Sequence, residues 1–559
     1  MKNKNSIRCV FKMSFFYVLS FLFFLNSIQI CAATSTLGLQ TQPAPTSQLA
    51  KIASINGVPT LQADGRPVLI IGAQCDIWRS TRQDEQTLFF FDSYKAMNAT
   101  VVSVGIPWSK IEPTKDHYDF SFLDWFLEQA RKRDLHLVIN LFNCNVCGKV
   151  QEGSGLNAYP QYTPSYILSS PSNYQRMVMP TNWVYDSGGP PMCPNDPRML
   201  ERERLLCSQI AQHLAAVDSR GTIVMIQIDN EFYYQQWVGG RPKDEQSIRC
   251  HCQYCETKWN SAKWKDCEDF MFHSFADYVR VLTDAITAIH PLPLYVNSPW
   301  WNPRVIPIFL DTCSNLAVVG IDGITDPCEP NMLSRSQVSR NILFAAENPT
   351  EEPKTRMNLD ILPYYTLIGQ MGIGNLLWEC SSPRTVVEDS SRRQRYANAL
   401  YPIRWAQSPI ANARGTENLF GWFAQREVST NLSTDIHGNF VSTNVNNPIV
   451  TKERFFVREG TRSHMEEIQP FDVTLAGLHV TIKSGSAGIL IKTAANELLL
   501  ALPAGELSIS GTQIIECTEG HFEDEHWIPE HAFPARRDGK AFIIATQTPK
   551  VIQLKIEKR

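Results

Sequence analysis

The sequence predicts an α/β fold, in which a (β/α)8 barrel (TIM barrel) is followed by a C-terminal antiparallel β-sandwich domain. From about residue 66, short apolar runs alternate with amphipathic segments of helical length. After roughly residue 410 the pattern changes, and Thr, Val and Ile alternate with polar residues between closely spaced Gly and Pro. The length of 559 residues suits one large barrel with an accessory domain.

The barrel prediction depends on eight apolar runs separated by helical segments. Strands of a parallel sheet are buried on both faces, so they consist of continuous Val, Ile and Leu residues. The predicted strands are Val68–Ala73, Thr100–Ile106, Leu135–Phe142, Ile223–Ile228, Leu292–Asn297, Ala317–Ile321, Ile342–Ala346 and Gly374–Trp378. The predicted helices are Asp84–Met97, Ser121–Arg133, Met199–Val217, Cys267–Ile289 and Pro363–Met371. An open doubly wound sheet is the alternative, but the Gly-rich phosphate loop that usually follows its first strand is absent from the sequence.

The chain divides into four predicted segments. Residues 1–33 are an export signal, and residues 34–50 are a flexible linker rich in Thr, Ser, Pro and Gln. Residues 51–408 form the catalytic barrel. Residues 409–559 form the β-sandwich, whose alternation is clearest in Leu475–Lys483.

The N-terminus has the three parts of a secretory signal. Basic residues precede an apolar run from Met13 to about Ile30, and Cys31-Ala32-Ala33 supplies small residues for cleavage after Ala33. The alternatives are an uncleaved membrane anchor, because the run is nearly long enough to span a bilayer, and a lipoprotein modified at Cys31. We expect an exported protein, periplasmic or extracellular, whose only membrane contact is this signal. Cleavage removes four positive charges and changes the net charge from −4 to −8.

The composition excludes several classes of protein. With 43% hydrophobic and 19% charged residues, the chain is not disordered, collagen-like or a coiled coil. A net charge of −4 does not provide the basic surface of a nucleic-acid-binding protein, so no nucleic-acid partner is expected. The sequence leaves a homo-oligomer open.

Two predicted strands end in a carboxylate. The run Thr222–Asn230 leads into Glu231 at the end of the fourth strand, and Ile342–Ala346 leads into Glu347 at the end of the seventh. Catalytic groups of barrels lie at the carboxyl ends of strands, and two facing carboxylates are the minimum machinery for glycoside hydrolysis. Glu379 ends the eighth strand and competes with Glu347 for the role of nucleophile. Its strand comes one place after the seventh strand, on which the nucleophile is expected.

Several segments resemble β-galactosidases of glycoside hydrolase families 42 and 35. These segments are Trp108–Pro113 with Tyr118–Asp124, Gln227–Glu231, Leu343–Pro349 and Gly369–Trp378, and the resemblance covers about residues 50–410 in order. It implies a retaining exo-glycosidase in which Glu231 is the acid/base and Glu347 the nucleophile. It also implies that Asn230 bonds the substrate 2-hydroxyl and that Trp378 stacks on the sugar.

The sequence departs from family 42 in three respects. There is no room for the middle α/β domain of these enzymes, the end of the sixth strand lacks the expected aromatic residue, and the substrate-binding arginine has no clear counterpart. These departures concern the identity of the sugar more than the class of reaction.

Further polar and aromatic residues follow predicted strands and are candidates for substrate binding. Aromatic rings pack on the C–H faces of sugars, and amides bond their hydroxyl groups. The candidates are Trp108, Trp300, Asn143 and Asn297. Ordinary packing in the protein interior is the alternative for each tryptophan.

A cluster of cysteines follows the fourth strand. Cys250, Cys252 and Cys255 have the C-x-C-x2-C spacing that can fill three corners of a tetrahedral zinc site. We choose Cys193 as the fourth ligand, because family 42 enzymes often have a similar zinc cluster, with one cysteine before the acid/base strand and three after it. We expect a structural Zn2+ and no catalytic cofactor. Disulfide pairing, which export permits, and His251 as a substitute ligand are the alternatives.

These inferences predict a retaining exo-glycosidase that hydrolyses terminal β-D-galactosides by double displacement. Its substrate is a β-linked oligosaccharide or glycoside, and its two catalytic carboxyl groups lie about 5–5.5 Å apart. Three alternatives remain open. They are a glycosidase for another sugar (glucoside, arabinoside or mannoside), a non-catalytic exported carbohydrate-binding barrel and a zinc-dependent hydrolase.

Overall fold

The structure is a computed structural model of the chain. It describes residues 49–75, 83–142, 162–178, 192–230, 249–298, 304–322, 340–342, 344–349, 374–379, 389–429, 433–434, 440–441, 463–467, 470–475, 477–523 and 525–558. The predicted export signal, almost all of the predicted linker and the predicted helix Pro363–Met371 lie outside these ranges. None of the helices in these ranges combines the length and the apolar character that crossing a membrane requires.

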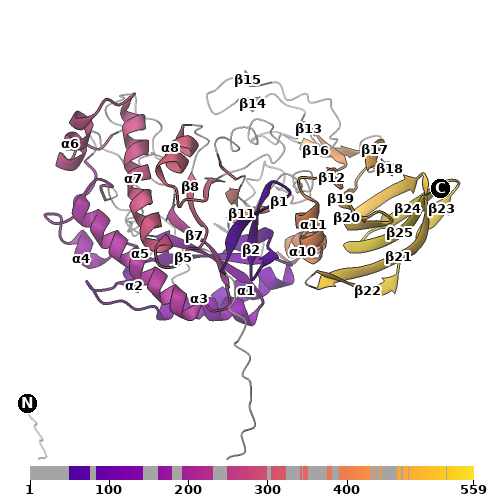
Figure 1. Cartoon of the computed structure of the whole chain (residues 1–559), viewed down its shortest axis with the longest axis horizontal. Coiled ribbons are helices and arrows are strands. Elements are labelled where there is room, and N and C mark those ends of the chain that lie inside the picture. Colours follow the sequence, from indigo (N-terminus) through magenta and orange to yellow (C-terminus); the bar gives the residue numbers. More distant parts are fainter. Residues whose placement is uncertain are drawn as a thin grey trace, which may run out of the picture. The chain divides into compact units, whose positions relative to one another are not determined.

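Eight parallel strands form a closed ring in chain order (Figure 1). They are β4 (Ile70–Gln74), β5 (Val101–Pro107), β6 (His136–Phe142), β7 (Ile223–Asn230), β8 (Leu294–Ser298), β9 (Val318–Asp322), β10 (Ala345–Pro349) and β11 (Gly374–Glu379). The ring closes where β11 pairs with β4. All eight predicted strands are present and in the predicted order. The largest error is at β10, which begins at Ala345 and includes Pro349, whereas the sequence predicted a start at Ile342 and an end before that proline.

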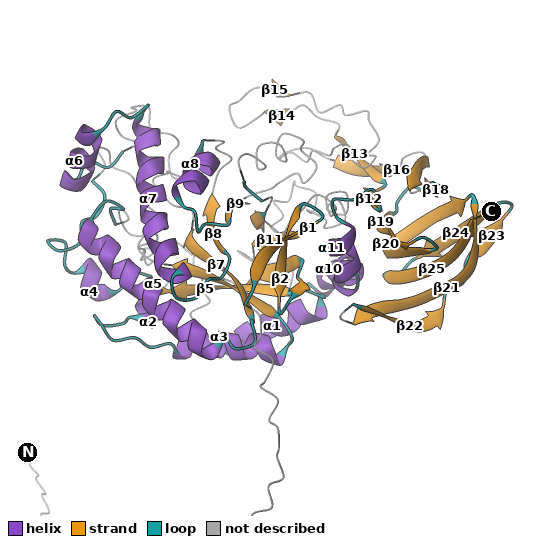
Figure 2. Cartoon of the chain, viewed as in Figure 1, coloured by secondary structure: helices purple, strands orange, loops and turns teal. Residues whose placement is uncertain are grey.

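Helices connect the strands and lie outside the ring (Figure 2). The longer ones are α1 (Glu85–Ala96), α3 (Ser121–Lys132), α5 (Pro197–Val217) and α7 (Cys267–Thr287), and each begins and ends within two residues of its predicted bounds. Shorter helices are α2 (Trp108–Ile111), α4 (Ser165–Leu168), α6 (Gln253–Ser261) and α8 (Val305–Thr312). The segments after β9 and β10, where two further barrel helices are expected, are not among the described residues.

Helix starts follow the capping chemistry of the sequence. The Asp84 carboxylate accepts from the backbone N–H of Thr87, and the Asp266 carboxylate accepts from that of Asp269. Each of these aspartates satisfies a backbone donor that the first turn of a helix would otherwise leave unpaired. These caps explain why α1 and α7 begin where the sequence predicted.

A small antiparallel sheet precedes the barrel and was not predicted. It consists of β1 (Lys51–Ile55), β2 (Val58–Ala63) and β3 (Arg66–Pro67). Asn56 and Gly57 both have positive φ, 50° and 79°, as a two-residue hairpin turn of type I′ requires. The Asn56-Gly57 pair was therefore the sequence signal for this hairpin.

Ten of the described C-terminal strands form one continuous antiparallel sheet. The long strand β20 (Glu497–Ser510) pairs through its first half with β19 (Ala487–Ala494) and β25 (Lys550–Lys558), and through its second half with β18 (Leu478–Ile482) and β24 (Ala541–Thr546). The other strands of this region are β12 (Leu419–Phe423), β13 (Gln425–Ser429), β14 (Ser433–Thr434), β15 (Phe440–Val441), β16 (Ser463–Glu467), β17 (Phe471–Leu475), β21 (Thr512–Glu523), β22 (His526–Ala532) and β23 (Arg536–Asp538). Of these, the pairs β13–β16 and β14–β15 form two separate two-stranded sheets.

The sequence predicted an antiparallel β-sandwich, and the structure shows an antiparallel sheet whose two halves share the long strand β20. Gly505, with φ of 128°, lies between the two halves of this strand, and glycine adopts such a conformation without steric cost. A buried apolar cluster that includes Val480, Leu500 and Ile544 lies between the layers that the two halves create. Alternation predicted the antiparallel strands correctly, but it does not reveal that one strand serves both layers.

Two helices connect the barrel with this sheet. They are α10 (Ser390–Trp405) and α11 (Gln407–Ala413), and the predicted domain boundary at residues 408 and 409 falls inside α11. Apolar residues of the sheet, such as Ile491 and Leu499, belong to the same buried cluster as the barrel core. The sheet therefore uses one face to cover the helices and the other to form its own core.

Candidate active site

The fourth and seventh strands of the ring carry the predicted catalytic positions. β7 ends at Asn230, so Glu231 follows it directly, although Glu231 itself lies outside the described residues. Glu347 is the third residue of β10, and its backbone lies in register with Asp322 of β9. The structure thus confirms the strand order on which the choice of these two glutamates rests.

The competing carboxylate lies on the neighbouring strand. Glu379 is the last residue of β11 and lies in register with Pro349, while Trp378 lies in register with Asn348. For Glu379 and Trp378, as for Glu347, the structure describes the backbone only. Glu379 belongs to the eighth strand, as the sequence indicated, and Trp378 is one residue from the end of it.

A bulge shapes the end of β7. The pairing register between β7 and β8 shifts between Gln227 and Asp229, so residues that are three apart meet on one side of the strand. Gln227 Nε2 donates to Asn230 Oδ1 over 2.8 Å, and Asn230 is 1% exposed. Bulges often redirect a strand next to an active site, and this one fixes the side chain that immediately precedes Glu231.

Two buried amides at strand ends make no hydrogen bond within the described part of the chain. They belong to Asn297, the second-last residue of β8, and to Gln74, the last residue of β4. Both side chains are fully buried, at 0% and 1% exposure. Because a buried polar group without a partner is costly, such groups at a barrel mouth point to a ligand that supplies the missing partners. Asn297 was predicted from the sequence, and Gln74 was missed although the same strand-end rule applies to it.

Asn140 of β6 is a useful contrast. Its Oδ1 accepts from Ser103 Oγ over 3.1 Å and from Tyr295 OH over 3.2 Å, inside the barrel. The oxygen of this amide is therefore held inside the barrel, although its Nδ2 has no partner among the described residues, whereas neither polar atom of the Asn297 amide has one.

Asn297→Ala is expected to reduce kcat/KM by about ten- to a hundredfold and to change the free energy of unfolding by less than about 1 kcal/mol. No hydrogen bond among the described residues is lost in this variant. Asn140→Ala is the matched control and should lose about 2 kcal/mol of stability with its two hydrogen bonds. Urea unfolding and steady-state kinetics of both variants measure the contrast. Loss of stability without loss of kcat/KM in Asn297→Ala would contradict a substrate-binding role.

Trp108 is held by the protein itself. Its ring is 1% exposed, and Nε1 donates to Glu112 Oε2 over 2.8 Å. The structure therefore gives this predicted substrate-stacking residue a packing and hydrogen-bonding role, because no ring face is left at the surface. The sequence could not separate these roles, since both place a tryptophan directly after a strand.

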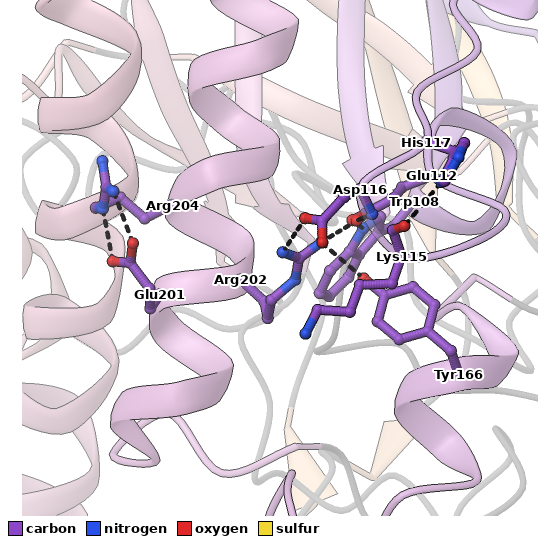
Figure 3. A network of polar contacts seen from close by, with 9 residues as sticks. All are labelled: Trp108, Glu112, Lys115, Asp116, His117, Tyr166, Glu201, Arg202 and Arg204. Carbon is purple, nitrogen blue, oxygen red and sulfur yellow. Dashed lines mark hydrogen bonds and ion pairs between the residues drawn. The ribbon is translucent and has the colours of Figure 1, made fainter.

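The carboxylate of Glu112 is the centre of a buried polar network (Figure 3). Glu112 is 0% exposed and accepts from the Arg202 guanidinium and, over 2.8 Å, from the backbone N–H of Asp116. Arg202 also pairs with Asp116 Oδ1 over 2.7 Å and donates to Tyr166 OH over 3.2 Å. The hydrogen bond from Arg202 lowers the pKa of Asp116, and burial raises the pKa of Tyr166.

This network ties the segment after β5 to α5, the helix that precedes β7. Arg202 comes from α5, 90 residues after Glu112, so no local spacing in the sequence indicated the pair. Figure 3 also shows Arg204, two residues further along α5, paired with Glu201 on another side of the helix.

Arg202→Met is expected to destabilise the protein by about 3–5 kcal/mol, because it leaves the Glu112 carboxylate buried without its cation. Arg204→Met is the matched control and should cost less than about 1 kcal/mol, because its pair with Glu201 is exposed to solvent. Chemical unfolding of both variants tests the difference. Equal stability of the two would show that the Glu112 pair contributes nothing beyond an exposed one.

The structure brings the four selected cysteines together. The Sγ atoms of Cys193, Cys250, Cys252 and Cys255 all lie within 4.8 Å of one another, and all four residues are buried. Cys193 Sγ is 3.4 Å from the Sγ atoms of both Cys252 and Cys255. A disulfide requires about 2.05 Å, and all four cysteines are free, so the disulfide alternative is not supported here.

The surroundings of the cluster hold these sulfurs in place. Val178 N donates to Cys250 Sγ over 3.3 Å, and Asn195 donates through its backbone to Cys193 Sγ and through Nδ2 to Cys255 Sγ. Hydrogen bonds with the other three thiols raise the pKa of Cys193 and lower that of Cys252.

His251 does not join the cluster as the sequence allowed. Its Nδ1 lies 2.8 Å from Glu256 Oε1, a carboxylate that also pairs with Arg249. The chain on both sides of the three-cysteine segment is thus fixed by an ion pair as well as by sulfur contacts.

Two further predicted site residues, Asn143 and Trp300, lie outside the described residues. Their substrate-binding roles stay predictions. Among the described residues, the sequence analysis missed Gln74, Glu112 and Arg202.

Residues 78–145 match the family model of glycoside hydrolase family 42, which is described as β-galactosidase. The matched segment contains β5, the Trp108–Glu112 hydrogen bond and β6. Over this segment the chain is similar to the β-galactosidases of glycoside hydrolase family 42. No curated protein matches the sequence of this chain.

Solved structures with a similar arrangement include several glycosidases. A β-galactosidase from Bacillus circulans sp. alkalophilus is 10% identical, and the match covers 86% of this chain and 98% of that one with a TM-score of 0.42. A β-mannanase from the blue mussel Mytilus edulis is 12% identical, with 64% and 96% covered and a TM-score of 0.38. A β-galactosidase from the Antarctic haloarchaeon Halorubrum lacusprofundi is 13% identical, with 60% and 58% covered and a TM-score of 0.40.

Proposed function

We propose that this chain is a retaining exo-β-galactosidase of the glycoside hydrolase family 42 type, built on a complete (β/α)8 barrel. The observation that carries the proposal is the strand order. Glu231 directly follows the fourth strand of the closed ring and Glu347 lies on the seventh. Glu231 follows the carboxyl end of β7, and Glu347 lies two residues before the carboxyl end of β10, and barrel enzymes hold their catalytic groups at this face.

In the first step, a carboxylate oxygen of Glu347 attacks the anomeric carbon of the galactosyl unit. The bond from this carbon to the leaving oxygen breaks, and Glu231 gives its proton to that oxygen. Glu347 is then joined to the sugar as an ester. Two inversions retain the β configuration, so the carboxyl groups should lie about 5–5.5 Å apart.

In the second step, Glu231 accepts a proton from water as the oxygen of that water attacks the anomeric carbon. The ester bond breaks, galactose leaves, and both carboxyl groups return to their starting state. The amides of Asn230, Asn297 and Gln74 supply donors and acceptors for sugar hydroxyl groups, and Trp378 supplies a stacking face.

A panel of nitrophenyl glycosides tests the proposal. We expect kcat/KM to be highest on the β-galactoside, and proton NMR of the first product to show the β anomer. Faster hydrolysis of the glucoside, arabinoside or mannoside would change the proposed sugar specificity but would leave the proposed mechanism in place. Release of the α anomer would overturn retention.

We also propose that the cluster of four cysteines holds one structural Zn2+. The donor set fits this ion, because four sulfurs about 2.3 Å from a central zinc lie about 3.8 Å apart in a tetrahedron, close to the 3.4 Å between Cys193 and its two neighbours. Zinc would cross-link the segment before α5 to the segment that follows β7. A site closed by four thiolates supplies no open position for chemistry, so its contribution is to stability.

The N-terminal segment supports export as a further proposal. The basic residues, apolar run and Cys31-Ala32-Ala33 site have the order of a secretory signal. N-terminal sequencing of the mature protein should begin at Thr34. An uncleaved N-terminus in a membrane fraction would favour the anchor instead.

A further inference from the structure

A cavity lies beside α11, on the face of the C-terminal sheet that packs against this helix. Its volume is about 490 Å³, within the range of roughly 300–1,000 Å³ that is usual for small-molecule sites. Side chains from α11, from the turn after it, from β19 and from the β21–β22 hairpin line it. We call this cavity the α11 groove. Figure 1 shows α11 next to β12 and β19.

The groove continues a face that is apolar elsewhere. Ile491 of β19 and Leu499 of β20 belong to the core shared with the barrel, and they are directly paired. Side chains alternate along a strand, so Glu497 lies on the same face as Leu499. Gln553 lies there too, because it pairs with Leu499, and both polar residues line the groove. The face therefore changes from apolar to polar where the helix no longer covers it.

Two aromatic rings form one wall. Phe522 and Trp527 pair across the β21–β22 hairpin, with ring centroids 5.3 Å apart and planes inclined at 57°. A Cβ at Gly520 would lie 2.8 Å from the Trp527 ring, so the absence of a side chain there lets the ring lie against the strand. Trp527 Nε1 is buried and makes no hydrogen bond within the described part of the chain.

The polar wall includes two side-chain amides. The side-chain amides of Asn418 and Gln553 line the groove and form no hydrogen bond with other described residues. Its charged residues are Lys492, Glu497 and Glu525, a net charge of −1. Such a lining disfavours uronate or sulfated glycans and suits hydroxyl groups, while the rings suit the C–H face of a pyranose.

We propose that the α11 groove binds a neutral glycan chain at a site separate from the active site. The choice of a glycan as ligand rests on the proposed glycosidase function. The groove would hold the enzyme on polymeric substrate while the barrel removes terminal residues, so its loss should leave hydrolysis of a small glycoside unchanged.

Affinity electrophoresis of the full chain tests the proposal, with Glu347→Gln as background so that the polymer is not degraded. The gels contain β-1,4-galactan, β-1,4-mannan or polygalacturonate. We expect retardation by a neutral polymer and none by polygalacturonate. Trp527→Ala should weaken the retardation by on the order of tenfold, the effect of one lost stacking ring. Gln553→Ala, which removes no packing ring, should weaken it several-fold.

Ile515→Ala is the matched control, because Ile515 lies on the same strand as Phe522, is 63% exposed and does not line the groove. It should bind like the parent. Glycan binding in the α11 groove would be contradicted if no neutral polymer retarded the protein. It would also be contradicted if Trp527→Ala and Gln553→Ala were retarded as much as the parent. Stronger retardation by polygalacturonate than by the neutral polymers would contradict the proposal that the ligand is a neutral glycan. Hydrolysis of a nitrophenyl galactoside by the same substitutions in the wild-type background reports separately on the proposed function.

Discussion

Glu347→Gln is expected to lower kcat on nitrophenyl β-galactoside by about 10⁴-fold or more, with little change in stability. The amide is not a nucleophile, so the glycosyl ester cannot form and the two-step route is closed. Steady-state kinetics at matched protein concentration measure the loss. Azide, a small external nucleophile, should restore part of the rate in Glu347→Gly and give the α-galactosyl azide, because only one inversion then occurs.

Glu379→Gln is the matched control, since Glu379 ends the neighbouring strand β11. It should retain kcat within about tenfold. A 2-fluoro-galactoside that traps the ester should label the peptide containing Glu347. If the label were found on Glu379, or if Glu347→Gln were fully active, the choice of Glu347 as nucleophile from the order of the strands would be wrong.

Cys255→Ser is expected to abolish the proposed zinc binding and to lower stability by more than about 3 kcal/mol. Zinc binding by four thiolates contributes directly to folding free energy, and the cluster joins segments on both sides of β7. Zinc content by atomic spectroscopy should be one ion per chain in the parent and near zero in the variant. The apparent Tm should fall by several degrees.

Cys517→Ser is the matched control, because Cys517 is also a free cysteine but is remote from the cluster in the described contacts. It should keep both the zinc and the Tm. A parent protein without zinc would contradict the site. If zinc-free Cys255→Ser keeps its fold at low temperature, it should hydrolyse substrate at the parent rate, and a complete loss of activity there would instead favour a catalytic zinc.

The ring of strands was predictable because burial on both faces leaves a strong local signal. All eight strands were found as apolar runs, and β7 and β10 occupy the predicted fourth and seventh places. The error at β10 has a local cause, since Pro349 was taken to stop a strand that instead includes it. A proline is tolerated at the end of a strand, where it need not donate to the ladder.

The candidate site was predictable only in part. A carboxylate or amide at a strand end is visible in the sequence, as Glu231, Glu347 and Asn297 show. The partner of a buried side chain is not visible, because Arg202 reaches Glu112 across 90 residues through the packing of α5. For the same reason, the sequence could not show whether Trp108 is buried and hydrogen-bonded to Glu112 or stacks on a substrate.

The sequence by itself determined the number and order of barrel strands, the antiparallel character of the C-terminal part and the close spacing of Cys250, Cys252 and Cys255, while Cys193 was added from the resemblance to family 42. The features read from the sequence alone depend on residue type and on short spacings along the chain. Only the tertiary structure decided that β20 serves both layers of the sheet, that Glu112 and Arg202 meet, and that Phe522 and Trp527 line a groove beside α11. These features arise where distant segments pack together, and no local pattern of residues encodes which segments will meet.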